Sequence, residues 1–100
     1  MDELNIETFF EEGVLKMKLI GRVNAVNAEK IMESAKQYFD GLRTIIIDVA
    51  QIEYLSSSGV RQLVQLNTVA RSKGGRLFVR NANDIVKEIL DGIGLLDFVS

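Results

Sequence analysis

The chain has 100 residues, 47% of them hydrophobic and 26% charged, with a formal net charge of −2 at pH 7, which is the composition of one ordinary globular domain. It contains no cysteine and no histidine, so the chain alone cannot form a disulfide, a thiolate metal site or a catalytic pair of serine or cysteine with histidine. No apolar run approaches the ~20 residues that cross a bilayer, and the acidic balance gives no general attraction for nucleic acid or anionic membrane, so we expect a cytoplasmic protein that binds neither.

Residues 6–19 are predicted to form a β-hairpin. Side chains alternate in polarity over residues 6–11 and again over residues 15–19, which is the pattern of two strands that each have one face in water. Glu12-Gly13 supplies the turn between them. We predict that Gly21 ends the second strand.

A helix and a buried strand follow the hairpin. Apolar residues recur at helical spacing over residues 28–39, so we predict a helix there, capped by Asn27 and ended by Asp40-Gly41. The β-branched run at residues 44–47 lacks alternation, which is typical of a strand buried on both faces. We expect this strand to be central in the sheet and to be followed by a loop over residues 48–55.

The second half of the chain continues to alternate strands and helices. A Ser-Ser-Ser-Gly run at residues 56–59 directly precedes a second helical stripe over residues 60–70, which Gly74-Gly75 ends. The remaining predicted elements are a strand over residues 76–80, a helix that begins at Asn83 or Asp84 and ends at Gly92, and a hydrophobic tail over residues 95–99.

The order of these elements is strand, strand, helix, strand, helix, strand, helix, which favours an α/β fold. Strand-helix-strand alternation in the middle favours parallel pairing with right-handed crossovers, and the initial hairpin makes the sheet mixed. We predict a small α/β sandwich that forms a single domain over residues 1–100. Its helices pack on a mixed, mainly parallel sheet of four or five strands.

The serine run at residues 56–59 is the feature of the sequence that suggests a chemical function, because serine hydroxyls can accept a phosphate. A helix begins with N–H groups that lack an internal acceptor and with the positive end of its dipole, so a hydroxyl there can cap the helix and a phosphate there is stabilised. Phosphorylation adds about −1.5 to −2 charges, which can repel a docking protein without refolding the domain. The same run also fits a plain helix cap, for which Ser58 is the better candidate.

A longer stretch around these serines resembles a known family. Residues 45–60 read IIIDVAQIEYLSSSGV and are followed by a helix, Gly-Gly-Arg-Leu and a strand; this arrangement resembles the STAS domain family, specifically the bacterial anti-sigma factor antagonists. Gly21-Arg22-Val23-Asn24 is similar to the family's loop between the second strand and the first helix, and residues 89–95 are similar to its closing helix and turn. The resemblance covers essentially the whole chain and implies a STAS-like fold.

The resemblance implies a phosphorylation-switched interaction module that regulates transcription and is not itself an enzyme. Ser57 matches the position that an anti-sigma factor with serine kinase activity phosphorylates. In the family, the unmodified form binds this kinase and thereby releases the sigma factor, phosphorylation ends the interaction, and a serine phosphatase restores it. ATP belongs to the kinase, so no cofactor and no metal are expected in this chain.

The same resemblance and the helical spacing suggest which residues meet the partner. The resemblance points to Asn24, Ser56, Ser58 and Gly59. Arg61 joins them because it lies one helical turn after Ser57, where a guanidinium can meet a phosphate or a partner carboxylate. Asp48 is predicted to accept loop N–H groups at the end of the central strand, with a place on the partner-facing surface as the alternative.

Two positions depart from the family pattern and leave alternatives open. The family often has aspartate where this chain has Asn24 and Ser56; Asn24 keeps the shape and hydrogen-bonding reach of aspartate, whereas Ser56 keeps neither its size nor its charge. Ser56 and Ser58 are alternative phosphate acceptors. A second hypothesis is a constitutive STAS subunit of a lipid-transport ATPase complex or of a signalling scaffold. A third, a small hydrolase, would need a base near Ser57, and the sequence points to no lysine for that role.

Overall fold

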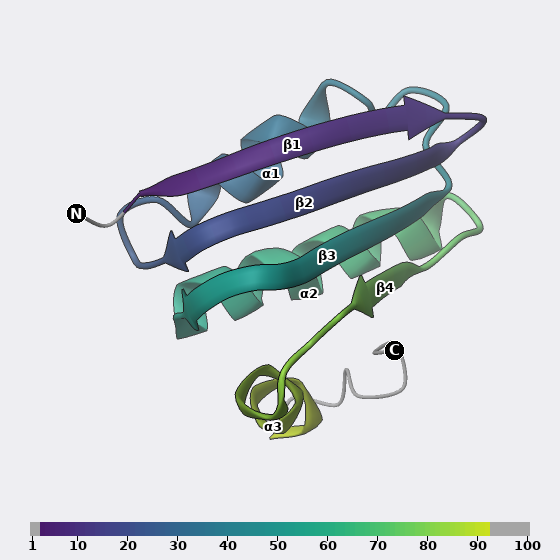
Figure 1. Ribbon diagram of the computed structural model, residues 1–100. Coiled ribbons are helices and arrows are strands. Elements are labelled where there is room, and N and C mark those ends of the chain that lie inside the picture. The colour runs from purple at the N-terminus through teal and green to yellow at the C-terminus, as the bar shows by residue number, and fades with distance from the viewer. Residues whose placement is uncertain (1–2, 93–100) are drawn as a thin grey trace.

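The computed structural model describes residues 3–92, and these residues form one mixed four-stranded sheet (Figure 1). The strands, in their order across the sheet, are β1 (Leu4–Glu11), β2 (Val14–Val23), β3 (Thr44–Leu55) and β4 (Leu77–Arg80). β1 pairs with β2 in the antiparallel sense, whereas the pairs β2–β3 and β3–β4 are parallel. The predicted fold class is therefore confirmed, with four strands in the sheet.

Two helices cover one face of this sheet, and a third helix follows the last strand. The helices are α1 (Glu29–Lys36), α2 (Ser57–Ser72) and α3 (Asp84–Gly92). α1 connects β2 to β3 and α2 connects β3 to β4; both lie behind the sheet in Figure 1 and contact each other. Asn83 and α3 line a groove together with residues 52–55 of β3. Within residues 3–92, no helix is long and apolar enough to cross a membrane.

The hydrophobic core lies between the sheet and the helices α1 and α2. Every second side chain points into this layer over residues 15–19 of β2 and 45–49 of β3, so that most of the strand contribution to the core comes from alternate residues. The fully buried members from these two strands are Leu15, Met17, Leu19, Ile45, Ile47 and Val49, and the helices contribute Ile31, Leu63 and Leu66. Ile46 points to the other face and is only half-buried. The prediction that residues 44–47 are buried on both faces is therefore wrong, although the strand is internal, between β2 and β4.

Two strands continue beyond their predicted ends. β2 runs through Gly21 to Val23, and β3 includes residues 48–55, which we predicted to be a loop. The parallel pairing of β2 with β3 shifts register on both sides of Gly21, which disturbs the two-residue alternation from which strands are recognised. Gly21 has a φ of +110°, and a Cβ there would collide with the carbonyl oxygen of Glu3, so glycine permits the irregularity inside the strand rather than ending it.

The helix boundaries also differ from the predictions. α1 ends at Lys36 and is preceded by Ala28, without a side-chain cap; the Asn27 side chain faces the preceding loop instead, so the prediction that it caps the helix is wrong. For α3, the Oδ1 of Asn83 accepts a hydrogen bond from the Val86 N–H at 2.9 Å, which confirms Asn83 as a cap. The hydrophobic tail predicted over residues 95–99 lies outside the described residues.

Candidate functional site

The candidate site lies where β2 and β3 end side by side. Val23 and Leu55, the last residues of the two strands, are paired in the parallel register. The N–H of Ser56 then donates to the carbonyl oxygen of Val23 at 2.9 Å. Because neighbouring parallel strands end at the same edge of the sheet, the loop of residues 24–28 and the start of α2 leave this edge together (Figure 1).

Ser56 is the N-cap of α2. Its backbone is extended, with φ −76° and ψ 167°, and its Oγ accepts a hydrogen bond from the Gly59 N–H at 3.2 Å. The first intrahelical bond runs from the Val60 N–H to the Ser56 carbonyl at 3.0 Å. The prediction that Ser58 is the structural cap is therefore wrong. The hydroxyl of serine provides the same kind of cap acceptor as an aspartate carboxylate, so Ser56 keeps the capping function that the family's aspartate can serve.

Ser57 is the first residue of α2 and is exposed to solvent. Among residues 3–92, its hydroxyl makes no hydrogen bond, whereas the Oγ of Ser56 is engaged in the cap. Ser58 is half-buried. Of the three serines, Ser57 is thus the one whose hydroxyl is both exposed and uncommitted. Its position at the positive end of a 16-residue helix is one where an attached anion is stabilised.

Gly59 is buried on the inner side of α2 and does not face outward. A Cβ built on it would come within 2.5 Å of Cγ1 of Val23 and 2.7 Å of Cδ1 of Leu55. Both side chains belong to the core. The predicted partner contact by Gly59 is therefore corrected: glycine is needed here because it lets the start of α2 approach the ends of the two strands.

Asn24 shapes the neighbouring loop through a reciprocal pair of hydrogen bonds with Asn27. The Oδ1 of Asn24 accepts from the N–H groups of Val26 at 2.8 Å and Asn27 at 2.9 Å, and the Oδ1 of Asn27 accepts from the Asn24 N–H at 2.9 Å. The Nδ2 of Asn27, which is 5% exposed, donates to the Arg22 carbonyl at 2.9 Å. An acceptor oxygen at position 24 is what this loop requires, and asparagine supplies it without a negative charge.

Two basic side chains lie near the two loops, and the acidic Glu29 directly follows the first of these loops. Arg61 is exposed on α2, one turn after Ser57, as the spacing predicted. Arg22, which pairs with Tyr54 across β2 and β3, places its guanidinium 5.1 Å from the centre of the Tyr54 ring, a distance at which a cation is attracted to the aromatic face. Position 24 and the N-cap are neutral.

Two exposed apolar side chains in this region were not predicted as site residues. Val26, at the tip of the loop, is 92% exposed, and Tyr54 is 48% exposed. Large apolar side chains that stay in water beside a candidate docking site favour protein–protein contact over a small-molecule site. Val26 could have been recognised from the sequence, because it lies in a loop outside the periodic runs whose apolar side chains face the core.

Asp48 lies within β3 rather than at its end, and it faces away from α1 and α2. Its Oδ1 accepts from the Ala50 N–H at 2.9 Å and from the Asn81 Nδ2 at 3.1 Å. These two bonds and the positive charge of Lys18 lower the pKa of Asp48 against the raising effect of burial. Asp48 is seven residues before Leu55 in the strand, so it does not belong to the Ser57 end.

Comparison with known proteins identifies the family. The family model described as the STAS domain matches residues 5–100. The chain belongs to the STAS domain family. Among its relatives, this STAS domain is 31% identical over 86 residues to BtrV of Bordetella bronchiseptica, which is provisionally designated an anti-sigma factor antagonist; the match covers 85% of this chain and 74% of BtrV.

Solved structures share the fold of this STAS domain. The anti-sigma factor antagonist SpoIIAA in its unphosphorylated form superposes with a TM-score of 0.85 at 18% identity, covering 98% of this chain and 86% of SpoIIAA. The Bacillus cell fate determinant SpoIIAA in its phosphorylated form gives a TM-score of 0.80 at 17% identity, covering 98% of this chain and 89% of that one. The fold of this STAS domain is thus one that has been seen both with and without a phosphate.

Proposed function

We propose that this STAS domain is an anti-sigma factor antagonist whose binding is switched at Ser57. With Ser57 unmodified, the surface formed by the 24–28 loop and the first turns of α2 binds an anti-sigma factor that has serine kinase activity. Phosphorylation of Ser57 by that kinase ends the interaction, and a serine phosphatase restores it. The chain acts as binding partner and phosphate acceptor, and the kinase supplies the catalytic groups and ATP.

The observation that carries this proposal is the placement of the Ser57 hydroxyl. It is exposed at the first position of α2, beside a second loop that leaves the same edge of the sheet. The Ser56 cap secures the helix without using this hydroxyl. A kinase can therefore reach Ser57 without unfolding the helix start, and a partner that covers both loops must also cover Ser57.

The electrostatic effect of a phosphate is large enough to act as a switch. A phosphate brings about −1.5 to −2 charges to a residue that was neutral. The helix dipole and Arg61 stabilise that charge within the domain. Each acidic group that a partner holds within about 5 Å of the phosphate costs roughly 1–3 kcal/mol at effective dielectric constants between ~20 and ~80. Two or three such groups raise the Kd of a micromolar complex well above the micromolar range.

The relatives support this assignment. BtrV, the relative with 31% identity, has an anti-sigma factor antagonist designation. SpoIIAA shares the fold and has been solved in unphosphorylated and phosphorylated forms. The neutral residues Asn24 and Ser56 retain the loop and cap hydrogen bonds, so their departure from aspartate leaves the architecture of the site intact.

Phosphorylation is tested by intact mass. The chain is incubated with ATP and a candidate anti-sigma kinase from the same organism, and one phosphoryl group is expected on the wild type and on Ser58→Ala. Ser57→Ala should gain none. Phosphate on Ser57→Ala at the wild-type rate would refute Ser57 as the acceptor.

Switching is tested by binding of the same kinase. Ser57→Asp should weaken the complex at least about tenfold, whereas Ser72→Asp, which adds the same charge at the exposed far end of α2, should leave the affinity unchanged. Circular dichroism should show that both variants fold. If the wild type neither binds the kinase nor accepts phosphate, the constitutive STAS subunit becomes the better hypothesis, and capture of a transporter ATPase would support it.

A further inference from the structure

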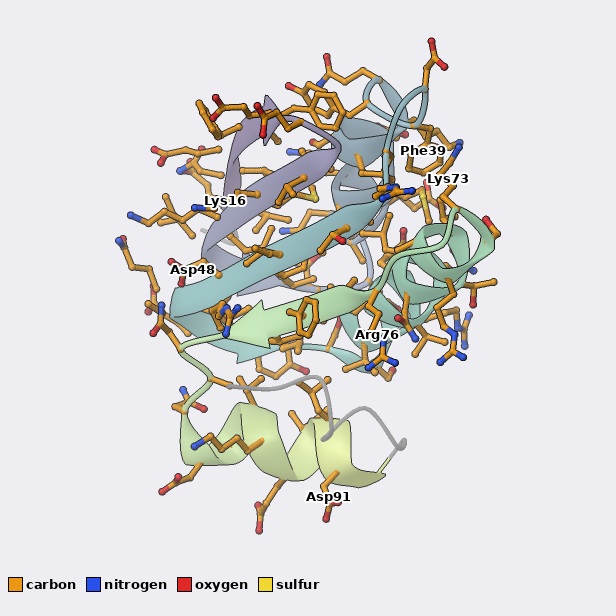
Figure 2. All side chains as sticks on the ribbon, turned by 90° about the vertical axis from the view of Figure 1, so that its right-hand side faces the viewer. Lys16, Phe39, Asp48, Lys73, Arg76 and Asp91 are labelled. Atoms are coloured by element: carbon orange, nitrogen blue, oxygen red, sulfur yellow. The ribbon has the colours of Figure 1, made fainter. Side chains whose placement is uncertain are left out.

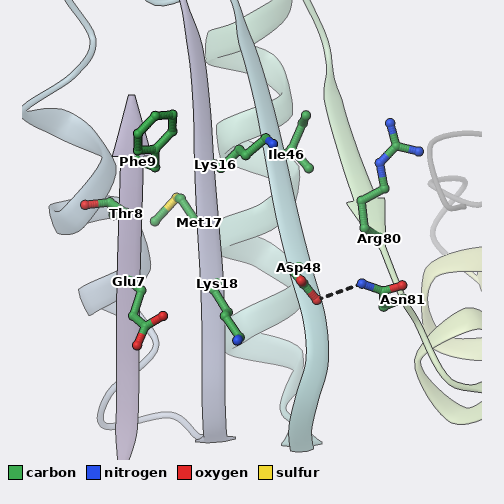
Figure 3. A pocket seen from close by; sticks show the side chains of 10 residues that line it. All are labelled: Glu7, Thr8, Phe9, Lys16, Met17, Lys18, Ile46, Asp48, Arg80 and Asn81. Carbon is green, nitrogen blue, oxygen red and sulfur yellow. Dashed lines mark hydrogen bonds between the residues drawn. The ribbon is translucent and has the colours of Figure 1, made fainter. Parts of the chain in front are cut away.

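The face of the sheet opposite α1 and α2 is open within the described residues. In Figure 2 this face lies on the left, where Lys16 and Asp48 project from it, and no helix of residues 3–92 covers it. Side chains from all four strands line a hollow on this face (Figure 3). Phe9, at 58% exposure, is its most exposed apolar side chain. An open face with this much apolar surface is a candidate interaction surface.

One row of side chains across this face is largely apolar. The strand register aligns Phe9 of β1 with Lys16 of β2, Lys16 with Ile46 of β3, and Ile46 with Phe78 of β4. Ile46 and Phe78 are half-buried within the sheet surface. The methylene stem of Lys16 can lie along this surface with its charge at the rim. The row therefore offers an aromatic group at each end and aliphatic groups between them, and the guanidinium of Arg80 lies 5.7 Å from the centre of the Phe78 ring.

The next row carries four charges of alternating sign. The register aligns Glu7 with Lys18, Lys18 with Asp48, and Asp48 with Arg80. Figure 3 shows these side chains on the same side of the sheet, with Asp48 bonded to Asn81. From β1 to β4 the signs are negative, positive, negative, positive. Read in reverse, the same row becomes positive, negative, positive, negative, which is its own electrostatic complement.

From this pattern we infer that the open face pairs with the same face of a second copy of the chain. A two-fold axis parallel to the strands and midway between β2 and β3 sets β1 opposite β4 of the second copy and β2 opposite its β3. Glu7 then faces Arg80 of the second copy, and Lys18 faces its Asp48. All four opposed pairs across the interface have opposite charges.

The apolar row selects the same arrangement. About this axis Phe9 faces Phe78 of the second copy, and the stem of Lys16 faces its Ile46. A two-fold axis across the strands would instead set the charged row against the apolar row, if it lay midway between them, or each charge against its own copy, if it lay along the charged row; both arrangements are costly. Face-to-face sheets pack ~10 Å apart with their strands within about 30° of alignment, and lysine and glutamate side chains can meet across that gap.

The size of the face indicates a weak dimer. Four strands ~4.8 Å apart and about six residues at ~3.3 Å each give roughly 400 Å² per copy. Because side chains make the surface uneven, two copies together bury about 800–1,200 Å² of accessible surface. This area is at or below the low end of the range for specific complexes. Exposed charge pairs add little affinity but set the orientation. We therefore expect association in the micromolar range or weaker, with the apolar row supplying most of the affinity.

Charge reversal distinguishes pairing between copies from pairing within one sheet. Glu7→Lys sets two positive charges against each other in its own dimer, and Arg80→Glu sets two negative charges against each other. A mixture of the two variants restores opposite charges at both outer contacts between copies. Mixing cannot repair the lost Glu7–Lys18 or Asp48–Arg80 neighbours within each chain, so recovery on mixing reports contact between copies alone.

The experiment is sedimentation velocity from ~10 µM to ~1 mM, with native mass spectrometry of the mixture. The wild type should dimerise with rising concentration, each variant alone should associate at least about tenfold more weakly, and the mixture should form a one-to-one heterodimer. Glu33→Lys and Arg71→Glu, which make the same charge changes on exposed helix positions, should dimerise like the wild type. A wild type that stays monomeric, or variants that dimerise alone as well as it does, would overturn the inference.

Discussion

The N–H of Ser56 donates to the carbonyl oxygen of Val23 at 2.9 Å, which joins the end of β2 to the first residue after β3. This bond continues the parallel pairing one residue beyond the strands and into both loops. It fixes the start of α2 relative to the loop that begins at Asn24. The exposed Ser57 hydroxyl is therefore held at a defined place beside a second surface loop. A partner that contacts both loops at once requires this geometry.

Substitution of Gly59 should destabilise the domain. Alanine at this position places its Cβ 2.5 Å from Cγ1 of Val23 and 2.7 Å from Cδ1 of Leu55. Both neighbours are core side chains with little room to move. We expect Gly59→Ala to lower the free energy of unfolding by about 1–3 kcal/mol, measured by urea denaturation.

Gly92 supplies the control for this substitution. It also lies in a helix, and among residues 3–92 a Cβ there would have no atom within 4 Å. Gly92→Ala should be neutral or stabilising by up to about 1 kcal/mol, because alanine favours helix over glycine. Equal effects of the two substitutions would show that close packing at Gly59 is not what requires glycine.

Removal of the Ser56 hydroxyl should cost the stability of a helix cap. Ser56→Ala leaves the Gly59 N–H without its acceptor, and we expect a loss of about 0.5–2 kcal/mol in the free energy of unfolding. Ser58→Ala should change it by less than about 0.5 kcal/mol. Ser56→Asp should restore the cap, because a carboxylate accepts the same bond. A larger loss from Ser58→Ala than from Ser56→Ala would contradict the assignment of the cap.

The sequence predicted the fold class because the signals for it are local. The hairpin and the first two helices have clear periodicity, and the serine run with its following helix carries the resemblance to the family. The loop predicted over residues 48–55 was wrong because the register shifts beside Gly21 disturb the alternation of β3. No local pattern shows that two strands from distant parts of the chain undergo such a shift.

The candidate site was predicted in part for a similar reason. Helical spacing placed Arg61 near Ser57, and turn chemistry predicted a capping serine. Which serine caps depends on where β3 ends, so Ser58 was chosen in place of Ser56. The burial of Gly59 depends on Val23, 36 positions earlier in the chain, and only the packed structure shows that contact. The charge row of the open face likewise arises from pairing between all four strands.

Asn27 should be important for the shape of the loop. Its Oδ1 accepts the Asn24 N–H and its Nδ2 donates to the Arg22 carbonyl, and the residue is 5% exposed. Asn27→Ala removes the acceptor of the Asn24 N–H and the donor to the Arg22 carbonyl, for which we expect a loss of about 1–3 kcal/mol in the free energy of unfolding.

An isosteric change separates the two bonds of Asn27. Asn27→Asp keeps the acceptor for Asn24 but replaces the donor to Arg22 with an oxygen. It should therefore destabilise at neutral pH and recover part of the loss as the new carboxyl protonates on acidification, followed by urea denaturation over a pH series. Full stability of both variants at pH 7 would show that the loop does not depend on this side chain.

Asp48 should make stability depend on pH in the acid range. The N–H of Ala50, the amide of Asn81 and the charge of Lys18 lower its pKa below the ordinary value of 3.8, against the raising effect of burial. A carboxyl whose pKa is lower in the folded state stabilises the fold above its unfolded pKa, and this contribution is lost as the pH falls through the folded pKa. The free energy of unfolding should thus decrease below about pH 4. Asp48→Asn should flatten this decrease. Asn81→Gly, which suits the φ of +62° at that position but removes the amide donor, should flatten it partly, and an unchanged acid slope in both variants would exclude Asp48 as its source.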